Sequence, residues 1–87
     1  LKSGMFARVS VPVGTRQAVL VPADAVIRRG QLTGVWTVRT DGSAHLRWVR
    51  RGRAIGDSVE ILSGLTGNET VVLSTQQPLA EGDRVVN

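Results

Sequence analysis

The sequence contains no cysteine, one histidine and only three aromatic residues in a length of 87. Without cysteine the chain can form no disulfide and no thiolate metal site, and one histidine cannot supply the several imidazoles of a typical catalytic zinc centre. No apolar run approaches the roughly 18 residues that a transmembrane helix needs. We therefore expect no metal, no cofactor and no membrane-spanning segment within this sequence.

Reactive side chains are also too few for an enzyme. A catalytic triad needs a base beside a nucleophile and an orienting acid. The one imidazole base is His45, and Ser43 precedes it by two residues. On a strand this spacing only places the two side chains on one face. We interpret His45 as an exposed strand residue and predict that the protein has no catalytic residues.

The composition is that of one small soluble domain, with 41% hydrophobic and 21% charged residues. The net charge is +4, and ten of the eleven cationic residues are arginine. This excess leaves open the alternative of a small basic β-barrel that binds nucleic acid, with an affinity that falls steeply as salt rises. Single-strand binders, however, interleave several stacking aromatic residues with their cations. The scarcity of aromatic residues therefore favours a solvated basic surface without nucleic-acid binding.

Hydrophobic periodicity predicts short strands along the chain. Residues 5–11 alternate, so we expect Met5, Ala7, Val9 and Val11 to face the core. Pro12 and Gly14 follow and end this strand. Further strand segments are expected at 17–21 and 25–28, with a single turn at 22–25 between them. A loop that carries Gln31 and Leu32 then precedes the next strand.

The dipeptide Asp41-Gly42 predicts a hairpin between residues 35–40 and 44–51. A two-residue loop would set Trp36 opposite Arg47. A three-residue loop, from Asp41 to Ser43, would set Trp36 opposite Trp48 and gather the large apolar side chains on one face. We prefer the three-residue loop, because a slip of one residue would turn those side chains to water.

These segments together predict an all-β fold. The short strands, the closely spaced turns and the absence of a helical period favour a small β-barrel of about seven or eight short, mainly antiparallel strands. The expected core consists of Val9, Val11, Leu20, Val26, Val38, Leu46, Trp48, Ile61, Leu65, Val71 and Val85.

The order of several short motifs carries a resemblance to a known family. The motifs are Leu1-Lys2-Ser3-Gly4-Met5, Val21-Pro22-Ala23-Asp24-Ala25-Val26, Gly34-Val35-Trp36-Thr37-Val38, Ile55-Gly56-Asp57, Glu60-Ile61-Leu62-Ser63-Gly64-Leu65 and Val71-Val72. Together they resemble the C-terminal part of periplasmic adaptor subunits, or membrane fusion proteins, of tripartite efflux pumps of the resistance-nodulation-division type. The resemblance spans nearly the whole chain, although Ser3 stands where the family pattern has proline.

The resemblance implies a division of the chain and a set of partners. Residues 1–11 would form the closing strand of the adaptor β-barrel domain, and residues 12–87 the membrane-proximal β domain. The domain would dock on a proton-driven inner-membrane transporter, and other parts of the adaptor would engage an outer-membrane channel. Adaptor protomers would associate with one another. The protein would be periplasmic and held at the inner membrane only through an N-terminal segment outside this sequence.

The residues expected to contact the transporter lie in two predicted loops. Arg28, Arg29, Gln31 and Leu32 form the first, where arginine suits an acidic partner and an apolar loop residue suits a contact. Arginine that only keeps a strand edge soluble is the competing interpretation. Asp41 and Gly42, at the tip of the predicted hairpin, form the second group.

The resemblance also predicts self-association of the isolated chain. In the family, a strand from the N-terminal region of the protein completes the membrane-proximal domain. A chain without that strand keeps an unpaired sheet edge, which favours pairing with another chain. We expect a dimer or strand exchange, measurable by size-exclusion chromatography with light scattering. A clean monomer at high concentration would contradict this prediction.

Overall fold

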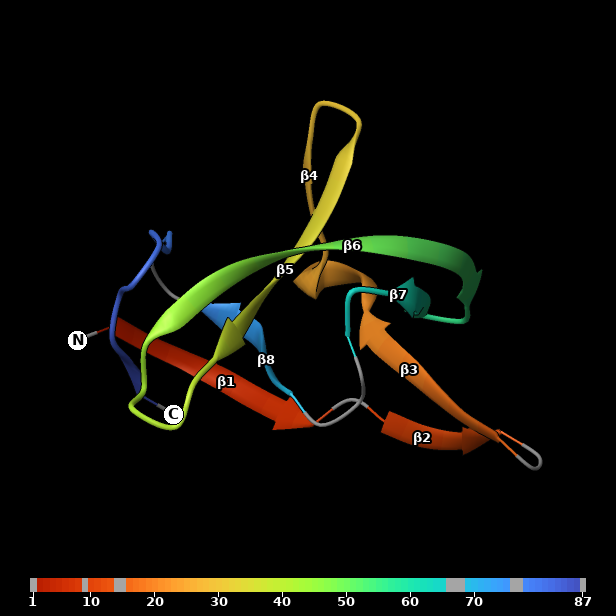
Figure 1. Ribbon diagram of the computed structural model, residues 1–87, viewed down its shortest axis with the longest axis horizontal. Helices are drawn as coiled ribbons and strands as arrows, with labels where there is room; N and C mark the ends of the chain where they lie inside the picture. The colour runs from red at the N-terminus through yellow and green to blue at the C-terminus, as the bar shows by residue number, and fades with distance from the viewer. Residues whose placement is uncertain (1, 9, 14–15, 66–68, 76–77, 87) are drawn as a thin grey trace.

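The computed structural model describes residues 2–8, 10–13, 16–65, 69–75 and 78–86. They form the strands β1 (Lys2–Arg8), β2 (Ser10–Val13), β3 (Arg16–Pro22), β4 (Ile27–Arg29), β5 (Leu32–Val38), β6 (Ala44–Ile55), β7 (Ser58–Ser63), β8 (Thr70–Thr75) and β9 (Val85–Val86), with the 3₁₀ turn η1 (Ala23–Ala25) (Figure 1). None of the described residues belongs to a helix long and apolar enough to cross a membrane. The predicted all-β class is confirmed, and so is the turn after Pro22.

The described strands form one sheet in the order β2-β3-β7-β6-β5-β8-β1-β9, with β4 attached to β5. Every pairing is antiparallel except that between β1 and β9. The order begins at β2 and ends at β9, and these two strands do not pair, so the described part of the sheet is open where a closed barrel was expected. The strand β1 belongs to this same sheet. The domain boundary predicted after residue 11 stays a prediction.

Two small cores lie against the central strand β5, one on each side. Val35 and Val71 belong to the first core, together with Val21, Ala25, Val59, Ile61 and Leu65. Trp36 and Val72 belong to the second, together with Ala44 and Val85. Alternate residues of a strand point to opposite faces, so neighbouring residues of β5 and β8 enter different cores. Residues 34–37 of β5 are consequently all buried.

The expected core is partly correct. Ile61, Leu65, Val71 and Val85 are buried, whereas Leu20, Val26, Val38 and Leu46 are half-buried. Trp48 was expected in the core but is 44% exposed, because it lies over Gly34 at the outer surface of the sheet. Val9 falls outside the described residues, as does the side chain of Val11. The buried Val21, Val35 and Val59 were not in the expected set.

The predicted face of the first strand is wrong. Met5 is 61% exposed, whereas Phe6 packs against the second core. The pairing with β8 contains an irregularity at this point, because Met5 faces Ser74 and Phe6 faces Val72. An aromatic ring buries a large apolar area, and turning Phe6 inward forces Met5 to the surface.

The predicted hairpin exists, but its register differs. Trp36 faces Leu46, and neither predicted partner of Trp36 is correct. The loop has the predicted three residues, Thr40 to Gly42, but begins one residue earlier. The Gly42 N–H donates to the Arg39 carbonyl at 2.9 Å, and Gly42 has a φ of 86°. In a three-residue loop that ends in the left-handed backbone conformation, glycine takes the third position. The pairing of the two strands is therefore shifted by two residues from the predicted one. Because the shift is even, the side chains stay on their predicted face.

The two glycines Gly64 and Gly56 offer a matched test of the packing. Both have positive φ, but a Cβ at Gly64 would lie 2.8 Å from the Trp48 carbonyl oxygen, whereas a Cβ at Gly56 would meet nothing within 4 Å. Gly56→Ala should lower the free energy of unfolding by about 1 kcal/mol through backbone strain alone. Gly64→Ala should cost roughly 1–3 kcal/mol more, because a clash is added. Equal costs in urea denaturation would contradict the close approach at Gly64.

Candidate functional site: a hairpin and the cleft at its base

The hairpin of β4 and β5 stands out from the body of the sheet (Figure 1). Arg29 pairs with Leu32, which leaves Gly30 and Gln31 as a two-residue loop. Gly30 has a φ of 63°, the positive value that a type II′ turn requires at its first loop position. The turn therefore brings together the first predicted contact group, Arg28, Arg29, Gln31 and Leu32, and all four residues are exposed.

The second predicted contact group lies elsewhere. Asp41 and Gly42 follow the opposite end of β5 and do not join the hairpin. Asp41 is exposed, but Gly42 is half-buried, and its carbonyl accepts a hydrogen bond from the Val85 N–H at 2.9 Å. This turn is therefore partly covered by the C-terminal segment of the chain.

A cleft opens at the base of the hairpin because the sheet divides there. One edge of β5 pairs with β6 along most of its length. The other edge pairs with β4 at residues 32–34 and with β8 at residues 37–38. Residues 35 and 36 lie between these two pairings, where β4 and β8 separate. The resulting cleft has a volume of about 390 Å³.

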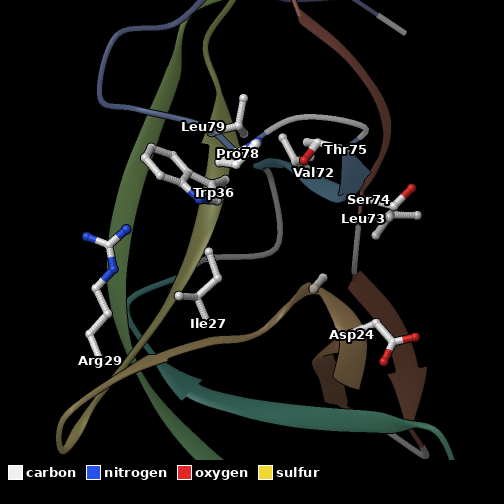
Figure 2. Close-up of a pocket in the computed structure, with 11 residues that line it drawn as sticks. Asp24, Ile27, Arg29, Trp36, Val72, Leu73, Ser74, Thr75, Pro78 and Leu79 are labelled. Carbon is white, nitrogen blue, oxygen red and sulfur yellow. The ribbon is translucent and has the colours of Figure 1, made fainter.

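The lining of the cleft combines apolar side chains with the polar Ser74 and Thr75, and charged residues lie at its margins (Figure 2). Figure 2 shows Trp36 between Ile27 and Leu79, with Arg29 and Asp24 on opposite sides. Trp36 is only 8% exposed, and the rest of the lining comes from η1, β8 and the segment at residues 78–79. No local motif predicts this arrangement, since the lining comes from segments separated by long stretches of chain.

Apart from the cleft, a cluster of polar side chains connects His45 to the C-terminal segment. The Ser43 hydroxyl lies 2.6 Å from Asp41 Oδ1 and 2.9 Å from His45 Nε2, and His45 Nδ1 contacts Glu81. Glu81 also accepts a hydrogen bond from the Leu46 N–H at 2.9 Å. The interpretation of His45 as an exposed strand residue is therefore wrong, because its ring is half-buried and bonded at both nitrogens.

The arrangement of serine, histidine and glutamate resembles a catalytic triad, but its protons are placed differently. A hydroxyl has one proton to donate, and the Asp41 carboxylate can only accept. Ser43 therefore donates to Asp41 and accepts from His45 Nε2. On the other side of the ring, His45 Nδ1 contacts the Glu81 carboxylate. The serine proton is thus directed at Asp41, and the cluster ties the C-terminal segment to β6.

Three carboxylates in this region have lowered pKa values. The Leu46 N–H, followed by the His45 side chain, lowers the pKa of Glu81. The Ser43 hydroxyl and backbone N–H lower the pKa of Asp41. The Lys2 ammonium group, 2.6 Å away, and the Ala80 N–H lower the pKa of Asp83. Each carboxylate is thus stabilised in its charged form by the folded structure.

These pKa shifts predict a loss of stability in acid. A carboxylate whose pKa is lower in the folded state stabilises the fold above its unfolded pKa, and this contribution is lost as the pH falls below about 4. Glu81→Gln should lower the free energy of unfolding at neutral pH, as measured by urea denaturation. It should also reduce the further decrease in that free energy when the pH is lowered to about 3. The unaltered chain is the reference for the full acid dependence. If Glu81→Gln leaves the acid dependence unchanged, Glu81 does not contribute as described.

Comparisons with known proteins agree with this architecture. The family model of the YknX C-terminal permuted SH3-like domain matches residues 18–87. Among the solved structures that match is the NMR structure of a 180-residue part of SilB from Cupriavidus metallidurans CH34, which encompasses an N-terminal metal-binding site and the membrane-proximal domain. The sequence identity is 27% and the TM-score 0.68, over 95% of this chain and 43% of that chain.

The present chain therefore spans less than half the length of the SilB chain that it matches. A search of curated proteins found no match. The family match begins within β3 and extends past β9, and thus includes both the projecting hairpin and the C-terminal segment. The chain belongs to the family of YknX C-terminal permuted SH3-like domains and is a C-terminal, membrane-proximal part of a membrane fusion protein.

Proposed function

We propose that this domain is a non-catalytic docking and coupling module of a periplasmic efflux adaptor of the resistance-nodulation-division type. It binds the periplasmic part of a proton-driven inner-membrane transporter. The rest of the adaptor links that transporter to an outer-membrane channel for the export of small molecules. Family membership supports the adaptor role, and the projecting β4–β5 hairpin is the observation that carries the docking role.

The hairpin has the composition of a protein contact. Leu32 is 54% exposed, although leucine is normally buried, and it pairs directly with Arg29. Arginine is enriched at protein interfaces, where a few residues contribute most of the binding energy. The arginine pair at 28–29 adds a preference for acidic surfaces, because guanidinium groups bind carboxylates through two parallel hydrogen bonds.

The remaining parts of the proposal concern the setting of the domain. The protein is periplasmic and associated with the inner membrane. Adaptor protomers associate with one another around the transporter. Residues 1–11 close the neighbouring β-barrel domain of the adaptor, and residues 12–87 form the docking domain.

Binding to the inner-membrane transporter encoded beside this protein tests the docking role. Leu32→Ala should weaken that binding by roughly tenfold, the effect of truncating an apolar anchor at an interface. Leu62→Ala is the matched control, because Leu62 is 56% exposed but lies on β7, outside the hairpin. Its affinity should remain close to that of the unaltered chain.

A random DNA duplex serves as the second control in the same assay. Binding to DNA alone, falling steeply with salt, would replace the docking role with nucleic-acid binding. Equal losses for the two leucine variants would place the contact outside the hairpin.

A further inference from the structure

We infer that the cleft at the base of the β4–β5 hairpin binds one apolar side chain of the docking partner, next to an acidic residue that pairs with Arg29. The inference rests on the proposed docking function and names the chemistry that the partner must present. Its occupant is an exposed, acidic segment of the transporter that carries a leucine or a similar side chain.

The size and lining of the cleft fit such an occupant. Its volume of about 390 Å³ lies near the lower end of the roughly 300–1,000 Å³ typical of binding pockets. A helix or a hairpin would not fit within it, but a side chain with its flanking backbone would. The groups that meet the occupant are apolar on three sides, from Ile27, Trp36 and Leu79. Figure 2 shows the Trp36 ring among these residues.

Burial of an apolar side chain within the cleft provides the affinity. Trp36 is 8% exposed, so its ring is fixed by the core before the partner arrives, and little side-chain entropy is lost on binding. Only a small part of the indole faces the cleft, and Ile27 and Leu79 supply further apolar contact. The cleft is therefore already formed in the unbound chain.

The charges at the margins give the occupant a preferred sequence and orientation. Arg29 is exposed on one side of the cleft, and Asp24 lies on the opposite side. A carboxylate next to the apolar side chain would meet Arg29, and the neighbouring Arg28 strengthens the positive potential there. A basic residue in the same position would be repelled. The net charge of +4 favours the same acidic partner at longer range.

A nucleic-acid occupant fits these features less well. A base needs an exposed ring for stacking, and Trp36 is only 8% exposed. A nucleic-acid strand also needs a row of cations along its backbone. Within the described lining the only cationic side chain is that of Arg29, and Asp24 would repel phosphate. The margins of the cleft therefore favour an acidic peptide.

The two tryptophans allow a direct optical test on the whole 87-residue chain. Trp48→Phe leaves Trp36 as the only indole, and Trp48 lies on the sheet surface with 44% of its area exposed. This variant is titrated with the peptide acetyl-Gly-Asp-Leu-Gly-Gly-amide, which places a single carboxylate beside the leucine. The expected result is a saturable change in the emission of Trp36, because the leucine displaces water from its ring.

Three controls make the test specific. A peptide with alanine in place of leucine, and one with lysine in place of the aspartate, should each bind at least roughly tenfold more weakly. Arg29→Ser should weaken binding of the original peptide to a similar extent. Arg53→Ser, at an exposed position of β6, should not change it. Circular dichroism of each variant verifies that the fold is retained.

Several results would overturn the inference. Unchanged emission up to millimolar peptide, in a folded variant, would show that the cleft does not bind this chemistry. Equal binding of the aspartate and lysine peptides would remove the role of Arg29. A change in emission with protein concentration alone would assign the cleft to a second copy of the chain. Each result leaves the docking function open, because that function is tested separately by the Leu32 variant.

Discussion

The fold depends on burying both faces of β5 within a chain of only 87 residues. Val35 packs into one core and Trp36 into the other, so neither core can form without this strand. The same constraint creates the cleft, because one edge of β5 is shared by β4 and β8, which separate at Trp36. Dense packing in the centre and an open recess at the surface therefore have a common origin.

Local signals predicted the strands and the turns better than they predicted which residues would meet. Alternating apolar residues and Gly-containing turns correctly indicated an all-β fold, and the exposed hairpin residues were recognised from their position between strands. The phase of β1 was missed, because either Met5 or Phe6 satisfies the alternation and only the packing of the ring decides. The hairpin register was missed because it depends on the φ of Gly42.

The cleft and the His45 cluster could not be predicted in this way. The cleft combines β4, β5 and β8 with Leu79, and the histidine cluster joins Ser43 to Glu81. Each site depends on long-range contacts that no motif records. The histidine cluster also shows why residue identity alone is a weak guide to catalysis. The serine, histidine and acid are all present, but the carboxylate of Asp41 accepts the serine proton that a nucleophile would have to transfer.

The two ends of the described chain lie side by side (Figure 1). Lys2 and Ser3 of β1 pair in parallel with Val85 and Val86 of β9, and the Lys2 N–H donates to the Arg84 carbonyl at 2.8 Å. The N-terminal end of β1 and the C-terminal end of β9 lie at opposite ends of this parallel pair. A force that pulls the two termini apart would therefore slide the strands past each other along their length. The connecting bonds would then bear the load together, so the domain could transmit a pull between its attachments before β9 detaches.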